Sequence, residues 1–192
     1  MVCRVTALIA ALVIAQPHAA APDDVAPPPV PASLEVPAGH TPFLIGHAEG
    51  TQAYICLPLG PGVSWTFLGP QATLFNGRSE QIVTHFLSPN PIENGAARAT
   101  WQHSRDTSTV WASAIASSSD PNYVAPGAIP WLLLEVVGAQ YGPAWGDKLT
   151  RTAFIQRVNT AGGVAPAAGC GTTADIGKRA LVPYTTDYIF YR

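Results

Sequence analysis

Four charged or titratable side chains interrupt apolar segments of the sequence and could carry acid–base chemistry. They are His85, Glu135, Arg157 and Asp187. Enzymes use histidine and carboxylate groups as general acids and bases, and perturbed groups in a cleft are functional candidates. The structural alternatives are a histidine satisfied in the core and a buried arginine–carboxylate pair, because a lone buried charge is costly. We favour the structural interpretation and keep these four residues as catalytic candidates.

Other sequence patterns indicate no defined active site. The sequence contains no G-x-S-x-G, H-E-x-x-H or C-x-x-C motif, and neither a P-loop nor an EF-hand loop. The histidines at 40, 47, 85 and 103 lack the spacing of a zinc motif, so we predict no metal site. Paired carboxylates could hydrolyse a glycoside at a separation of about 5–10 Å, which sequence alone does not supply. We expect no cofactor.

Tryptophan is the residue that could bind a sugar by stacking. Of the five tryptophans, Trp131 is followed by three leucines and is expected in the core. Trp101 and Trp111 could lie on opposite arms of one hairpin, where the register decides whether they share a face. Exposed, either could stack on a sugar ring, so both are ligand-binding candidates; the alternative is a tryptophan-rich core.

Short segments bounded by glycine and proline must position these residues. Segments rich in Val, Ile, Thr and Tyr suit a pleated, half-buried surface. The segment 129–138 fits either a strand or a two-turn helix, and we favour a strand. The predicted strands are 51–57, 71–75, 79–87, 99–103, 108–116, 129–138, 151–159 and 181–191. The sequence therefore predicts an all-β fold, an antiparallel β sandwich or partly closed barrel with little helix.

Two turns predict hairpins. Asn76-Gly77 separates the segments 71–75 and 79–87 and is a strong signal, because both residues accept positive φ. Residues 104–106 separate the segments 99–103 and 108–116. Both turns favour antiparallel pairing of neighbouring strands.

The N-terminus has the pattern of a secretory signal peptide. One basic residue precedes an apolar run that is too short to span a membrane, and small residues follow it. A short membrane anchor is the alternative. We assign residues 1–21 to the signal, 22–32 to a proline-rich tether and 33–192 to a single β domain. The chain is therefore expected to be periplasmic or extracellular, with no membrane span after signal removal.

Two cysteines remain once the signal, with Cys3, is removed. Cys56 and Cys170 would meet an oxidising compartment, where paired cysteines normally oxidise. We predict a disulfide between them; two free thiols or a bridge between chains are the alternatives. Closing a loop of about 100 residues stabilises a domain by roughly 4–5 kcal/mol in the chain-entropy model.

The composition excludes one class of partner. The chain is 47% hydrophobic and 11% charged, with a formal net charge of −2. No basic patch is visible, so nucleic acid is not expected as a partner. A low charge with many neutral polar residues fits an exported β protein. The composition leaves the oligomeric state open.

Several motifs together resemble the exported family known as domain of unknown function 3455, found in bacteria and fungi. The matching segments are Gly50–Cys56, Trp65 with Pro70–Leu74, His85-Phe86, Thr100–Gln102, Asp106–Val110, Ile129–Leu134, Ile155–Gly163, Pro166 with Cys170, and Pro183–Tyr191. The resemblance covers the region from about Ser33 to Arg192. It implies export and supports the cysteine pair, but it implies no mechanism.

One residue and one label depart from this resemblance. Thr107 stands where the family is expected to carry glycine in an Asp-Gly-Ser turn, so that hairpin could be longer here. Some fungal members carry a malate dehydrogenase label. The sequence argues against that activity, because no G-x-G-x-x-G follows a strand and the chain is short and poor in helix.

Two functions are therefore expected. The first is a non-catalytic exported binding protein for polysaccharide or another wall component. The second is an exported hydrolase or isomerase that uses histidine and carboxylate chemistry. A concave pocket lined by at least two of the four candidate groups would favour the enzyme, and an exposed tryptophan face would favour binding.

Overall fold

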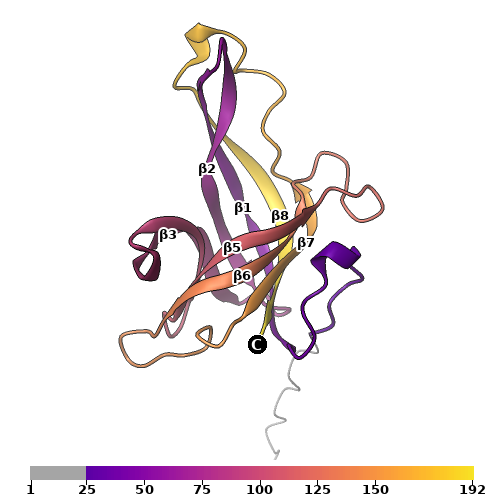
Figure 1. Cartoon of the computed structure of the whole chain (residues 1–192), viewed down its shortest axis with the longest axis vertical. Coiled ribbons are helices and arrows are strands. Elements are labelled where there is room, and N and C mark those ends of the chain that lie inside the picture. Colours follow the sequence, from indigo (N-terminus) through magenta and orange to yellow (C-terminus); the bar gives the residue numbers. More distant parts are fainter. Residues whose placement is uncertain (1–24) are drawn as a thin grey trace, which may run out of the picture.

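Eight antiparallel strands form a closed barrel in this computed structural model, which describes residues 25–192 (Figure 1). Each strand pairs with the next one along the chain, and β8 returns to pair with β1. The strands are β1 (Pro42–Leu59), β2 (Gly62–Phe75), β3 (Gln81–Asn90), β4 (Ala96–His103), β5 (Thr109–Ser118), β6 (Trp131–Gln140), β7 (Phe154–Gly162) and β8 (Arg179–Tyr191). The described helices are short 3-10 turns: η1 (Ala32–Leu34), η2 (Pro91–Glu93) and η3 (Thr173–Asp175).

The predicted all-β class is confirmed, and the sheet is a fully closed barrel rather than a sandwich or a partly closed barrel. Closure follows from β1, whose 18 residues pair with β2 on one side and with β8 on the other. Neither edge of β1 is then left open. Within residues 25–192, no helix has the length and apolarity needed to cross a membrane.

The segment 129–138 forms a strand as predicted, but β2 begins earlier than the sequence indicated. Gly69 and Pro70 look like punctuation, yet β2 continues through both of them from Gly62. A register shift opposite Ala53 and Tyr54 accommodates Gly69, whose φ is 147°. Such a bulge lets a strand pass through a glycine that would otherwise end it.

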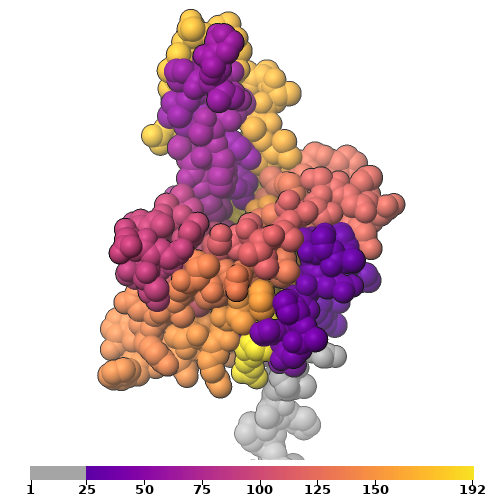
Figure 2. Space-filling model, viewed as in Figure 1, coloured from indigo at the N-terminus to yellow at the C-terminus, as the bar shows by residue number. Residues whose placement is uncertain are grey.

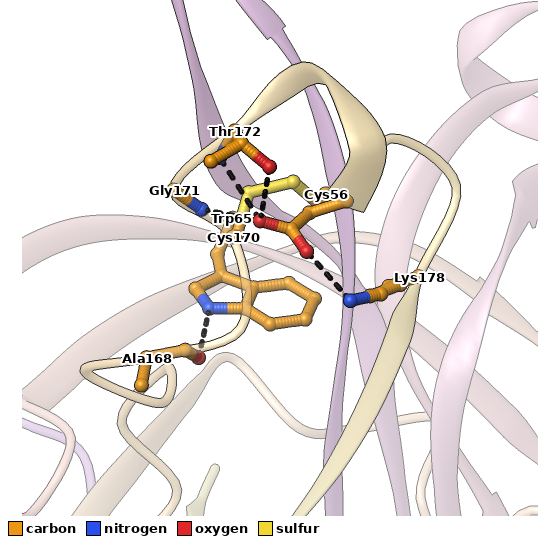
Figure 3. Close-up of a disulfide and its surroundings, with 8 residues drawn as sticks. Cys56, Trp65, Ala168, Cys170, Gly171, Thr172 and Lys178 are labelled. Atoms are coloured by element: carbon orange, nitrogen blue, oxygen red, sulfur yellow. Dashed lines mark hydrogen bonds and ion pairs between the residues drawn. A yellow bond between two sulfur atoms is a disulfide. The ribbon is translucent and has the colours of Figure 1, made fainter.

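The long β1–β2 hairpin projects beyond the barrel and is tied to the β7–β8 connection (Figure 1). The predicted disulfide between Cys56 and Cys170 is present and joins residues 114 positions apart in sequence. Figure 3 shows the Trp65 indole beside it; its N–H donates to the Ala168 carbonyl at 3.3 Å. The backbone N–H of Cys56 also donates to the Lys178 carbonyl. The hairpin is thereby held by covalent and polar contacts together.

Two apolar clusters stabilise the barrel, one inside it and one on its outer face. The inner cluster includes Leu74, Trp101 and Phe190. The outer cluster includes Trp131, Leu133, Val158 and Ile189, and is covered by the N-terminal segment through the fully buried Leu34. Figure 2 shows this indigo segment lying against the barrel.

The described part of the expected tether therefore packs on the domain. Val25 and Val30 lie against the outer cluster, and the Leu34 carbonyl accepts a hydrogen bond of 2.7 Å from Nε2 of Gln156. These valines stand between prolines and bury apolar surface against the domain. The free energy gained by this burial outweighs the conformational entropy that a free linker would keep. The signal assigned to residues 1–21 and the first three tether residues lie outside the described part of the chain.

Candidate functional site

A cavity of about 230 Å³ lies at the end of the barrel from which the hairpin projects. All eight strands contribute to its lining. Phe67 and Leu87 form its rim, and they are 50% and 42% exposed. Ala112, Leu132 and Leu134 form apolar walls below the rim. The site is therefore a pocket whose opening and walls are mostly apolar, as is common for sites that bind small molecules.

The floor of the pocket is polar and buried. Gln52, His85, Trp101 and Tyr188 all line it, and each is at most 3% exposed. Arg157 lines it as well and is partly buried. The pocket thus changes from an apolar rim to a floor that carries hydrogen-bonding groups and one positive charge.

Cross-strand pairing brings these residues together. His85 pairs with Trp101 between β3 and β4, and Arg157 pairs with Tyr188 between β7 and β8. Residues directly opposite each other on neighbouring strands point to the same face of the sheet. In a closed barrel the inward faces of all strands meet, so residues separated by more than 100 positions share one floor.

His85 is held as a neutral ring. Its Nδ1 lies 2.9 Å from the Thr100 carbonyl, which can only accept, so Nδ1 carries the proton. The ring stacks on Trp101 with centroids 4.2 Å apart. The pKa of His85 falls from 6.5 to about 3; burial is the largest cause, the Thr100 hydrogen bond opposes it, and the charge of Arg157 adds to the lowering. His85 is therefore uncharged at neutral pH, with Nε2 as an acceptor.

Arg157 has no carboxylate within ion-pair distance among residues 25–192. Its Nε and Nη2 donate to the Pro130 carbonyl at 3.2 and 2.7 Å. Its charge still acts within the barrel: burial raises the pKa of Tyr188, and Arg157 partly opposes this shift. The sequence led us to expect a buried arginine–carboxylate pair. This expectation is wrong, because Glu135 is exposed and Asp187 has other partners.

Two donors of the pocket have no hydrogen-bond partner in the described part of the chain. They are Nε2 of Gln52 and Nε1 of Trp101. The great majority of buried polar atoms in proteins are hydrogen-bonded, and leaving one unpaired costs about 1–3 kcal/mol. A third such donor, Nε1 of Trp131, lies in the outer cluster and not in the pocket. The floor therefore combines two unpaired donors with an uncompensated cation.

The other candidates lie elsewhere. Glu135 is on the outer surface. Asp187 accepts from His47 at 2.6 Å and from Asn159 at 2.8 Å, away from the pocket lining. Of the four catalytic candidates, the pocket brings together His85 and Arg157. In the part of the chain that the structure describes, no group of three His, Cys, Asp or Glu residues could hold a metal ion.

Trp101 and Trp111 occupy opposite faces of the β4–β5 hairpin. Trp101 pairs with Val110 and faces the barrel interior, whereas Trp111 pairs with Thr100 on the outer face. Trp111 is only 5% exposed, and its N–H donates to Oγ of Ser88 at 2.9 Å. Neither residue forms an exposed platform, and only Trp101 reaches the pocket.

Comparison with known proteins places the chain in a family. Residues 37–192 match the family model described as "Protein of unknown function (DUF3455)". The chain belongs to DUF3455. This match spans every strand of the barrel and both cysteines of the disulfide, so the resemblance drawn from the sequence is confirmed. No curated protein and no solved structure is detectably similar to this DUF3455 member. The family description carries no activity.

Sequence reasoning missed two members of the pocket floor. Gln52 stands in the predicted strand 51–57 next to Thr51, and nothing in the sequence marks it as lining a cavity. Tyr188 lies in the predicted strand 181–191 and shares the inward face with Tyr184 and Phe190, but nothing in the sequence indicated that this face lines a cavity. The pairing of β7 with β8 brings Tyr188 beside Arg157, and the pairing of β1 with β8 brings Gln52 to the same end of the barrel.

Proposed function

We propose that this DUF3455 chain is an exported, non-catalytic binding protein whose ligand enters the end of the barrel and packs between its apolar walls. The observation that carries the proposal is the pocket itself, with an exposed apolar rim and a buried floor of unpaired donors. Small-molecule sites combine apolar walls with a few convergent polar groups in this way.

Export is supported by two independent features. The disulfide between Cys56 and Cys170 fits an oxidising compartment. The first 21 residues have the charge and apolar pattern of a secretory signal. The periplasm and the cell exterior are both compatible with these features.

The size of the pocket limits which of the ligands expected from the sequence could fit. A cavity of about 230 Å³ is below the roughly 300–1,000 Å³ typical of sites for drug-sized ligands. The pocket therefore suits a small molecule, or one end group of a larger wall component, better than the length of a polysaccharide chain. Wall fragments remain the first natural ligands to try.

The hydrolase or isomerase alternative is supported by His85 and Arg157, which share the pocket. A general base works best with a pKa near the working pH, and His85, with a pKa of about 3, is poorly matched to neutral conditions. Neither Glu135 nor Asp187 lines the pocket to supply a second group. We therefore favour binding without catalysis.

The test is a calorimetric binding screen of the oxidised domain against wall fragments and small apolar molecules. Ala114→Trp would fill the rim from an exposed position that pairs with Leu134, and we expect it to weaken binding at least 10-fold. The matched control is Ile115→Trp, which adds the same side chain to the neighbouring residue, itself 51% exposed.

A ligand that binds both variants equally would contradict the proposed site. A ligand that the domain converts to product would support the enzyme instead. If nothing in the screen bound saturably, the binding proposal would fail for these ligand classes.

A further inference from the structure

The two arginines that line the pocket differ in how their charge is balanced. Arg98 forms a two-point ion pair with Glu93, in which Nε and Nη2 donate to the two carboxylate oxygens at 2.8 and 2.7 Å. Arg157 instead donates to the neutral carbonyl of Pro130. The positive charge of Arg157 is therefore not compensated by any described side chain, although it lies inside the barrel mouth.

The unpaired donors of the floor are enclosed and have no acceptor in the described part of the chain. An indole N–H can only donate, so Nε1 of Trp101 requires an acceptor. Gln52 is 2% exposed, and its Nε2 lies near the Tyr184 hydroxyl without forming a well-aligned hydrogen bond. Arg157 adds a cation to the same floor. These three groups line one pocket and together favour an acceptor that carries negative charge.

We infer that the buried end of the ligand is a carboxylate, bound by Arg157, Gln52 and Trp101, with a short apolar body between Leu132, Leu134 and the rim. The inference rests on the proposed function. One uncompensated charge matches a monoanion, whereas a phosphate monoester would bring a second negative charge. Two planar oxygens suit a guanidinium and neighbouring N–H donors.

Two sources could supply this group: a free short-chain carboxylic acid, or the carboxyl terminus of a wall peptide. Hexanoate represents the first and acetyl-alanyl-alanine the second. Hexanamide is the matched neutral control, because it keeps the chain length and replaces the carboxylate by an amide. Comparing the two acids assigns the source, while comparing hexanoate with hexanamide tests the chemistry.

The experiment is calorimetric titration of the oxidised domain at pH 7. We expect at least one acid to bind about 10-fold or more tightly than hexanamide, as expected for charge-assisted hydrogen bonds. Arg157→Gln should abolish that preference. Arg151→Gln removes the same charge at an exposed position outside the pocket lining and should keep it. Gln52→Leu should weaken acid binding about 10-fold and provides a second test if Arg157→Gln does not fold.

Equal affinity for hexanoate and hexanamide would overturn the carboxylate inference and leave a binding pocket in place. Retained acid preference in Arg157→Gln would also overturn it, because the charge would then be recognised elsewhere. If neither acid binds while another ligand in the Ala114→Trp screen does, the inference fails and the proposed function stands. If no ligand binds in either experiment, both fail.

Discussion

Asp175 at the projecting hairpin and Arg157 in the barrel pocket are both charged, but within the described residues only Asp175 has an opposite charge beside it. Lys178 donates to Asp175 at 2.6 Å, and the backbone N–H groups of Gly171 and Thr172 donate as well. These contacts hold the pKa of Asp175 well below its usual range. Arg157 has no carboxylate partner among residues 25–192 and donates to the neutral carbonyl of Pro130.

The difference indicates what each region is for. The Asp175 contacts hold the β7–β8 connection in shape, and the disulfide fixes that connection onto β1. In the pocket, donors are left unpaired inside a packed barrel, which costs stability. Proteins accept such local costs mainly at functional sites. The hairpin therefore serves stability, whereas the pocket retains unpaired groups for a ligand.

Removing the disulfide should have the largest effect. We expect the double variant Cys56→Ser and Cys170→Ser to melt about 10 °C lower, because about 4–5 kcal/mol of chain-entropy stabilisation is lost. Scanning calorimetry of the oxidised, reduced and double-variant proteins measures it. An unchanged melting curve would show that the hairpin does not depend on its covalent link.

Leu34→Ala should have the next largest effect. Leu34 is fully buried where the N-terminal segment covers the outer cluster, so its removal leaves a cavity and costs about 3–4 kcal/mol. Leu59→Ala at the hairpin, where the side chain is 68% exposed, is the control and should change little. Urea denaturation compares them, and similar losses would mean that the N-terminal segment does not pack as described.

The buried His85 in the pocket floor should make the domain less stable in mild acid. His85 is neutral when folded, because its pKa falls from 6.5 to about 3. As the pH falls, His85 takes up a proton in the unfolded chain before it does so in the folded domain. The contribution of His85 to the free energy of unfolding is therefore fully present above pH 6.5 and is lost as the pH falls toward 3. At pH 5 the loss is about 2 kcal/mol.

The variant that isolates this effect is His85→Phe. Denaturation at pH 7 and pH 5 should give a stability difference that is smaller in His85→Phe than in the original protein. Equal differences in the two proteins would show that His85 is not buried in its neutral form.

The smallest effect concerns the β4–β5 turn. Thr107 adopts a φ of 56°, a left-handed conformation that glycine takes without strain. Thr107→Gly should therefore raise stability by up to about 1 kcal/mol. Thr109→Gly, in the neighbouring strand, should lower it. Thermal melts of both variants test this, and a loss of stability in Thr107→Gly would contradict the strain.

The sequence predicted much of the framework because its signals are local. Alternation and turn residues indicated the all-β class, the strand at 129–138 and a hairpin turn after Phe75, although positive φ falls on Ser79 and not on Asn76 or Gly77. The expected oxidising compartment of an exported chain indicated the disulfide between the two remaining cysteines. Thr107, expected to fit its turn less comfortably than glycine, does take positive φ.

The pocket could be predicted only in part, because it depends on long-range pairing. His85 and Arg157 stood out as polar residues in apolar strands, but their common floor needs the pairing of β1 with β8. Gln52 joins them only through this closure. The partner of Arg157 was also unpredictable, since a backbone carbonyl such as that of Pro130 leaves no mark in the sequence.

The most direct test of the account is a nuclear magnetic resonance titration with hexanoate that follows the side-chain N–H signals of the two regions. The indole N–H of Trp101 and the side-chain amide of Gln52 should shift saturably, with one dissociation constant, as they gain an acceptor. The indole N–H of Trp65, already bonded to Ala168 at the hairpin, should stay in place. Saturable binding that leaves Trp101 and Gln52 unchanged would contradict the assignment of the pocket as the binding site.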